Sequence, residues 1–274
     1  AGLAMTRRIT GDIQTSQHHD SAAKHVSGEA IYVDDIEVPA NCLTVLIAQS
    51  PHAHARITHM DLSAVAAAPG IVAVMSATDI PGVNDCGPMI HDDPVFASDE
   101  VCYVGQSVFA VAAVNMAATR AAISLAQIAY EPLPAILTID AAMVAGSLLG
   151  PPSEMIKGDS AAALVAATHQ LKGRLCAGGQ EHFYLEGQAA LAIPGEDGDI
   201  HLFCSSQHPS EIQHKTAEML GLANHAVTGE TRRMGGAFGG KESKGNLPAV
   251  TGALAAHLTG RPAKTTHARD DVFM

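Results

Sequence analysis

A cluster of four glycines between a predicted strand and a predicted helix constrains the fold of this chain more than any other segment. Residues 234–243 read MGGAFGGKES, with glycine at four of the six positions from 235 to 240. Residues 226–233 have the pattern of a strand, and the alanine-rich stretch 243–258 has the pattern of a helix. A strand, a glycine loop and a helix in this order predict a fold that mixes helices with a sheet.

The glycine loop is compatible with three roles. Residues 235–241 match the first seven positions of a phosphate-binding loop, G-x-x-x-x-G-K, whose eighth position is Ser or Thr. The eighth residue here is Glu242, whose carboxylate would face the phosphates, so nucleotide binding is disfavoured. Glycines also let the backbone approach another ligand closely, and a following helix N-terminus favours an anion. A purely structural turn is the third alternative.

Composition and charge exclude several classes of protein. With 274 residues, 47% of them hydrophobic, the chain has enough apolar material for one or two folded domains. Its net charge of -12 argues against nucleic acid as a main partner, because duplex binding requires a basic surface. No apolar run reaches the ~18–20 residues of a membrane-spanning helix. The polar N-terminal stretch lacks the apolar core of a secretory signal, so we expect a cytoplasmic protein.

The cysteines also favour a cytoplasmic protein. They stand singly, at Cys42, Cys86, Cys102, Cys176 and Cys204. None forms a C-x-x-C pair, so the sequence has no framework for a zinc ribbon or a four-cysteine iron–sulfur cluster. An odd number of scattered cysteines favours reduced thiols.

The order of candidate strands, helices and breakers predicts an α+β (mixed α/β) chain with two domains. The predicted parts are a flexible leader (1–19), a first domain (20–145), a linker (146–158) and a second domain (159–274). Within the second domain we expect a helix capped near Asp159, mostly strand from 171 to 207, and a helix that begins at Pro209 and ends at Gly221.

Two further polar segments are candidate binding sites. Ser205-Ser-Gln-His208 follows a strand candidate, so its side chains either contact a ligand or cap the helix that begins at Pro209. In residues 178–186, Glu181 and His182 would point to opposite faces of a strand, which argues against a metal site there.

A pair of histidines in the first domain is a weaker candidate. His52 and His54 would share one face of an extended segment. A third ligand is not evident, so exposed histidines at a strand end are the favoured interpretation.

Taken in order along the chain, seven segments give it a family resemblance. In the first domain they are HVSGEAIYVDD (25–35), SPHAHARI (50–57), YVGQ (103–106) and YEPLP (130–134). In the second they are GQEHFYLE (179–186), SSQHPSEIQH (205–214) and RRMGGAFGGKES (232–243). Together they resemble the molybdenum hydroxylases of the xanthine oxidase family, most closely the molybdopterin-binding subunit of xanthine dehydrogenase. The resemblance begins near residue 18. It implies an α/β hammerhead domain followed by the first portion of a molybdopterin-binding domain.

The resemblance also implies a reaction and its cofactors. The family's complete enzymes are oxidoreductases of purine catabolism that hydroxylate hypoxanthine and xanthine to urate. They contain molybdenum–molybdopterin, and they pass electrons through [2Fe-2S] clusters and FAD to NAD. In the bacterial two-subunit arrangement the FAD and iron–sulfur groups belong to a partner subunit.

Four positions take roles from the resemblance, and none is a direct metal ligand. Gln207 matches the glutamine that hydrogen-bonds an oxygen ligand of molybdenum. Phe238 and Gly239 match the loop that brings backbone against the metal's ligands. Glu242 matches the glutamate that hydrogen-bonds the purine, and relatives that oxidise aldehydes tend to lack this carboxylate. Ala237 departs from the family's usual glycine, and its methyl group would matter most at a positive φ.

Length is the larger departure. The family's subunit continues for several hundred residues beyond Met274, and its general-base glutamate and substrate-binding arginine lie in that part. We therefore expect a fragment or the product of a shortened gene, with no complete catalytic set. The isolated chain is predicted to bind no molybdenum cofactor and to be inactive. Apolar surface left uncovered would also favour a homo-oligomer.

Two other functions compete with xanthine dehydrogenase. One is an aldehyde oxidoreductase of the same family. The other is a non-catalytic remnant that only assembles with the FAD/iron–sulfur partner subunit.

Overall fold

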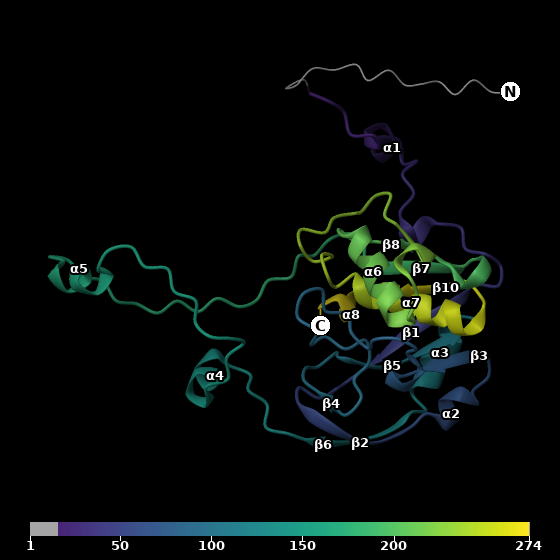
Figure 1. Cartoon of the computed structure of the whole chain (residues 1–274), viewed down its shortest axis with the longest axis horizontal. Helices are drawn as coiled ribbons and strands as arrows, with labels where there is room; N and C mark the ends of the chain where they lie inside the picture. Colours follow the sequence, from purple (N-terminus) through teal and green to yellow (C-terminus); the bar gives the residue numbers. More distant parts are fainter. Residues whose placement is uncertain (1–15, 274) are drawn as a thin grey trace.

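Two sheets organise the chain in the computed structural model, which describes residues 16–273 (Figure 1). The strands are β1 (Leu43–Gln49), β2 (Ala55–Asp61), β3 (Ile71–Met75), β4 (Glu100–Val101), β5 (Ser107–Ala113), β6 (Gln127–Pro132), β7 (Ala189–Pro194), β8 (Ile200–Cys204), β9 (Val227–Glu230) and β10 (Ala263–Thr266). The α-helices are α1 (Ala22–Ser27), α2 (Ser63–Ala66), α3 (Met116–Ile123), α4 (Ile139–Ala145), α5 (Ser160–Ala166), α6 (Pro209–Leu220), α7 (Asn246–Thr259) and α8 (Arg269–Phe273). Most of the predicted leader, 1–19, lies outside the described residues. The predicted mixed α/β class is confirmed.

The larger sheet joins strands from both halves of the sequence. Its order is β3-β5-β1-β10-β7-β8-β9, and the smaller antiparallel sheet has the order β4-β2-β6. The halves meet where β1 runs parallel to β10, with Leu43 opposite Ala263. The strands on either side of the predicted linker 146–158 therefore share one sheet, and the predicted domain boundary stays a prediction.

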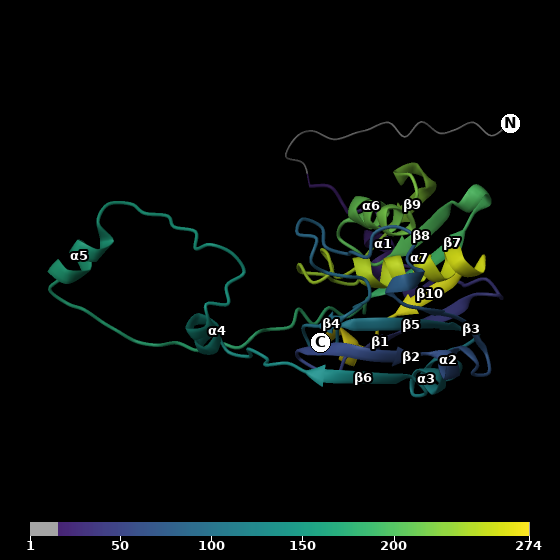
Figure 2. The ribbon, with the colours of Figure 1, turned by 60° about the horizontal axis from the view of Figure 1, so that its bottom comes forward.

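Strand β5 separates two hydrophobic cores. All seven of its residues are buried, because both faces of the strand are covered. Ala110 and Ala112 belong to the core under α6 and α7, whereas Phe109 and Val111 belong to the core under the small sheet, α2 and α3. Figure 2 shows the small sheet on one side of the large sheet and α6 and α7 on the other. This layering holds the ends of β7, β8 and β9 in fixed relative positions.

Local signals define several helix ends. The Asn115 side chain accepts from Ala118 N at the start of α3, and Asp159 accepts from Ala162 N at the start of α5, as predicted. Pro209 opens α6, and Gly221 closes it in the left-handed conformation with φ 66°. Among residues 16–273, no helix combines the length and the hydropathy needed to cross a bilayer.

Two predicted elements differ from the structure. The strand pattern over 171–207 holds only for β7 and β8, because the glycine-rich residues before 184 are exposed and pair with no strand. The helix predicted from 243 begins at Asn246. The residues that precede α7 form a turn instead, in which Glu242 N donates to Gly239 O.

An extended arm separates the two groups of strands. Residues 135–179, which include α4 and α5, project from the body of the molecule and are exposed almost throughout (Figure 1). The arm carries large apolar side chains such as Leu149, Met155 and Leu171, all fully exposed.

Candidate functional site

The ends of three strands bring three polar segments to one edge of the large sheet. Strand β8 runs parallel to β9, so both end at this edge, and antiparallel β7 begins there. Residues 184–188 before β7, 205–208 after β8 and 231–241 after β9 are therefore neighbours. Their hydrogen bonds to one another form the candidate site.

Gln207 is joined to the glycine loop by its backbone and its side chain. Its backbone N donates to Lys241 O at 3.0 Å, and its Oε1 accepts from Gly239 N at 3.0 Å and Lys241 N at 3.3 Å. Only the oxygen of a side-chain amide can accept, so these bonds assign its orientation. Nε2 of Gln207 donates to no acceptor within residues 16–273 and is left to donate to a ligand.

The loop next to Gln207 presents further donors. Gly240 N donates to Ala237 O at 2.7 Å and closes a turn. The backbone N–H groups of Gly236, Ala237 and Phe238 have no acceptor in the described part of the chain. These three amides and the Gln207 amide suit a ligand rich in oxygen or other acceptor atoms.

Two glycines of the loop are required by backbone conformation. Gly236 and Gly239 both have φ 96°, a backbone conformation that is unfavourable for every residue with a Cβ atom. Between them, Phe238 has φ 53° although its side chain is 76% exposed. An aromatic residue in this conformation is strained, and such strain concentrates at functional sites. Ala237 has no positive φ and is buried, so the loop accommodates its methyl group.

The other two glycines are required by close packing. A Cβ added at Gly235 would lie 2.6 Å from Glu186 Cβ. A Cβ added at Gly240 would lie 2.6 Å from Tyr184 Cε1. The loop is thus pressed against the segment before β7, and all four glycines have a structural reason that the sequence alone did not reveal.

Lys241 is fully buried, and its ammonium group binds side chains of the site. Its Nζ donates to Glu186 Oε2 at 2.9 Å and to Ser205 Oγ at 2.7 Å, and it lies 4.7 Å from the centre of the Tyr184 ring. Burial lowers the pKa of Lys241, and the hydrogen bond to Glu186 acts in the opposite direction. Because the ammonium group is buried and bound to Glu186 and Ser205, it is not presented to a phosphate, which argues against the nucleotide-loop alternative.

Glu242, the next residue, is exposed. Its side chain is 60% exposed, and Oε1 lies 4.0 Å from His208 Nε2. His208 Nδ1 lies 3.5 Å from Glu211 Oε2. A carboxylate beside the residue that follows Gln207 is free to meet a polar substrate.

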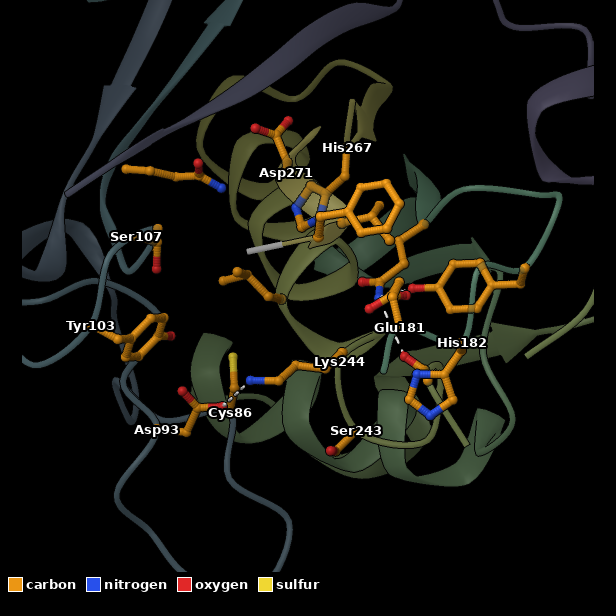
Figure 3. A pocket seen from close by; sticks show the side chains of 18 of the residues that line it. Cys86, Asp93, Tyr103, Ser107, Glu181, His182, Ser243, Lys244, His267 and Asp271 are labelled. Atoms are coloured by element: carbon orange, nitrogen blue, oxygen red, sulfur yellow. Dashed lines mark hydrogen bonds and ion pairs between the residues drawn. The ribbon is translucent and has the colours of Figure 1, made fainter. Parts of the chain in front are cut away.

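A cavity of about 300 Å³ adjoins the loop (Figure 3). Gly239 and Gly240 line it together with His182. Tyr103 and Ser107 line it from the first half of the chain. Both halves of the sequence thus contribute to the surroundings of the glycine loop.

The histidine pair of the first domain does not converge. His54 places Nδ1 2.8 Å from Pro134 O and Nε2 2.8 Å from Glu100 Oε1, whereas His52 packs against the Tyr130 ring. Among residues 16–273, no three His, Cys, Asp or Glu side chains form a group that could hold a metal ion. Burial raises the pKa of the Cys204 thiol to about 12, so it is not a ready thiolate ligand.

Sequence reasoning missed the buried members of the site. The sequence gives no role to Glu186, and it presents Lys241 only as the lysine of a phosphate-loop pattern. Nothing in the local sequence links these residues, which lie far apart in the chain and meet only when β8 pairs with both β7 and β9.

Two family profiles match the chain. The molybdopterin cofactor-binding domain matches residues 148–274, and the a/b hammerhead domain of aldehyde oxidase and xanthine dehydrogenase matches residues 27–134. The segments that meet at the glycine loop, 184–188, 205–208 and 231–241, all lie within the first of these matches.

Curated relatives are similar over nearly the whole chain. Xanthine dehydrogenase of Drosophila subobscura is 43% identical over 256 residues, and xanthine dehydrogenase/oxidase of Rattus norvegicus is 40% identical over 254 residues. Aldehyde oxidase 3 of Rattus norvegicus is 39% identical over 255 residues. Each match covers 92% of this chain and 19% of the relative, so the chain spans about a fifth of these proteins' length.

Solved structures share the fold. Quinoline 2-oxidoreductase from Pseudomonas putida 86 superposes with a TM-score of 0.78 at 24% identity, covering 95% of this chain and 35% of that one. Aldehyde oxidoreductase from Desulfovibrio gigas also gives 0.78, at 25% identity, covering 92% of this chain and 30% of that one. The predicted hammerhead and molybdopterin-binding architecture is confirmed.

Proposed function

Since the chain belongs to the family of aldehyde oxidases and xanthine dehydrogenases, we propose that it supplies one wall of the molybdopterin site in an enzyme that hydroxylates hypoxanthine and xanthine. In this proposal Gln207, Phe238 and Gly239 contact the cofactor, and Glu242 contacts the purine. The activity, substrates and partners are those of the complete enzyme, because the chain spans only 19% of its curated relatives' length.

The observation that carries the proposal is the orientation of the Gln207 amide. Its oxygen is occupied by Gly239 N and Lys241 N, so its Nε2 is committed to donating. The neighbouring N–H groups of Gly236, Ala237 and Phe238 add donors on the same loop. This donor set fits a cofactor that presents oxygen ligands and a hydrogen-bonding pterin.

The roles of the chain's own residues follow from these contacts. When bound, the molybdenum cofactor supplies the two-electron oxidation chemistry of hydroxylation. The Gln207 amide donates a hydrogen bond that orients the cofactor's oxygen-bearing side. The loop backbone adds donors that require no rearrangement on binding, which is the form of electrostatic preorganisation that favours catalysis.

Glu242 supports a purine as the substrate. A purine ring carries both donors and acceptors, and a carboxyl group can accept from or, when protonated, donate to it. A site with such a group discriminates against a substrate that leaves it unpaired. Aldehyde oxidation is the second candidate, because aldehyde oxidase 3 is 39% identical to the chain, close to the 40% of the rat xanthine dehydrogenase/oxidase.

Electron transfer to a partner is part of the proposal. The five cysteines are free thiols that do not cluster, which is compatible with iron–sulfur clusters on a partner subunit. The proposal places FAD on the same partner and the enzyme in the cytoplasm. Within the proposal, the isolated chain neither retains molybdenum nor forms urate.

The test compares the complete enzyme with the isolated chain. We expect the complete enzyme, purified with its FAD/iron–sulfur partner, to contain stoichiometric molybdenum and to form urate, and the isolated chain to do neither. Urate formation by the isolated chain would overturn the assignment of its inactivity.

Substitution of Glu242 decides between the substrates. Glu242→Val should lower kcat/KM for xanthine about 100-fold or more, and for an aromatic aldehyde much less. Glu242→Gln, which retains a polar group, should lie between wild type and Glu242→Val. Faster turnover of aldehydes than of xanthine by the wild-type enzyme would favour the second candidate.

A further inference from the structure

One oxygen atom of Glu186 connects the two ends of the glycine loop. Glu186 Oε2 accepts from Gly235 N, at the start of the loop, at 2.9 Å. The same oxygen accepts from Lys241 Nζ, at the end of the loop, also at 2.9 Å. Glu186 N donates in turn to Gly235 O at 3.2 Å. The loop is therefore closed by an ion pair as well as by its own turn.

Ser205 connects this ion pair to Gln207. Ser205 Oγ donates to Glu186 Oε2 at 2.7 Å and lies 2.7 Å from Lys241 Nζ. Ser205 precedes Gln207 by two residues on the segment that follows β8. The loop and the glutamine are thus fixed to one buried cluster, whose charged side chains are 0% exposed at Lys241 and 8% exposed at Glu186.

Stability alone does not account for a charged pair here. Removing two charges from water is costly, and well-packed apolar side chains of similar volume often hold a fold equally well or better. The cost is visible in Glu186 Oε1, which is buried and has no hydrogen-bond partner among the described residues. What an apolar pair cannot provide is an acceptor for Gly235 N and a directed link between the loop's ends.

We propose that Glu186 and Lys241 are positioning residues that hold residues 235–241 in the conformation that presents the loop's donors to the cofactor. The identity of the ligand rests on the proposed function. The ordering of the loop is a property of the chain itself and is measured separately.

The first measurement uses the full 274-residue chain without cofactor. In Glu186→Leu/Lys241→Met, both buried charges are removed, so thermal stability should recover relative to either single variant. The amides of Gly239 and Lys241 keep their acceptor on Gln207, yet we expect them to exchange with deuterium about tenfold faster than in wild type.

The second measurement uses the complete enzyme. The double variant should show a kcat about 10- to 100-fold lower, because the loop's donors are no longer aligned, although its melting temperature is close to that of wild type. Glu186→Gln, which keeps an acceptor for Gly235 N, should fall between wild type and the double variant in both measurements. It also serves as the test if the double variant does not fold.

Lys215→Met is the matched control. Lys215 forms another buried ion pair, 3.1 Å from Asp85 Oδ2, and its ammonium group hydrogen-bonds Asp85 and Glu218 and no residue of 235–241. The Lys215→Met variant should lower the melting temperature without changing the deuterium exchange of residues 235–241 or the kcat of the complete enzyme. If the double variant regains wild-type stability together with wild-type exchange and kcat, the pair is only structural and the proposal is wrong. If the wild-type complete enzyme lacks molybdenum and activity, the proposed function fails while the exchange measurement still decides the role of the pair.

Discussion

The side-chain oxygen of Gln207 lies 3.0 Å from the backbone N of Gly239, and this bond determines which end of the amide faces a ligand. The glutamine has two separable tasks. Its oxygen holds the loop, and its amino group is left to donate. Substitutions that remove one task at a time can separate them.

Gln207→Glu should keep the loop ordered but weaken the hold on the cofactor. A carboxylate still accepts from Gly239 N and Lys241 N, but it has no N–H to donate and it repels an oxygen ligand. We expect wild-type exchange at these two amides and at least about a tenfold loss of kcat in the complete enzyme. Gln207→Leu should lose both properties. Equal exchange in the Leu and Glu variants would contradict the loop-holding role.

Gly240→Ala should destabilise the loop by overpacking. Its new Cβ would lie 2.6 Å from Tyr184 Cε1 and 2.9 Å from His182 Nδ1, so either ring or backbone must move. We expect a loss of about 1–3 kcal/mol in the free energy of unfolding, measured by urea denaturation. Gly173→Ala is the control, because no atom lies within 4 Å of its added Cβ. Equal free energies of unfolding for the two variants would show that the loop accommodates the added methyl group without loss of stability.

Local elements of the fold were predictable because their determinants are local. Asn115, Pro209 and Gly221 mark helix ends through backbone bonds within a few residues. The pairing of β1 with β10 was not predictable, since the sequence of a short strand does not specify which distant strand it pairs with. Both strands largely alternate buried and half-buried residues, and their pairing becomes evident only in the assembled sheet.

The site divides in the same way. The glycine loop and Gln207 stood out through composition and family resemblance, and their roles toward a cofactor remain predictions. The Glu186–Lys241 pair could not be predicted from the sequence. A lysine that follows a glycine loop looks the same in the local sequence whether it binds a phosphate or is buried in an ion pair. The reasons for Gly235 and Gly240 were hidden too, since each depends on the side chain that packs against it.

Phe238→Gly should relieve strain at the expense of function. Phe238 has φ 53°, and its exposed ring loses little packing on removal, so we expect about 1 kcal/mol of added stability in the isolated chain. In the complete enzyme the more flexible loop should lower kcat. Asp197→Gly, at φ 56° in the turn before β8, is the control. It should add less stability, because Asp tolerates this conformation better, and leave kcat unchanged. A destabilised Phe238→Gly chain would show that the ring contributes packing.

A second buried ion pair attaches the loop before β4 to helix α6. Lys215 Nζ lies 3.1 Å from Asp85 Oδ2 and 3.0 Å from Glu218 Oε2, and His91 Nδ1 lies 2.9 Å from Asp85 Oδ2. Burial acts to raise the pKa of Asp85, but hydrogen bonds from His91 and Lys215 outweigh it and lower the pKa overall. Burial likewise acts to lower the pKa of Lys215, and its two carboxylate partners raise it overall.

These opposite shifts predict losses of stability at both ends of the pH range. A carboxyl group whose folded-state pKa is depressed stabilises the fold above its unfolded value, about 3.9, and this contribution disappears as the pH falls through the folded-state pKa. A lysine whose folded-state pKa is raised stabilises the fold below about pH 10.4, and its contribution disappears as the pH rises through the folded-state pKa.

At pH 7, Asp85→Asn should cost somewhat less than the about 3–5 kcal/mol of a broken buried pair, because Glu218 still accepts from Lys215. Urea unfolding from pH 7 to pH 3 should therefore show a shallower loss for Asp85→Asn than for wild type. Parallel acid profiles for the two chains would show that Asp85 contributes no pH-dependent stability.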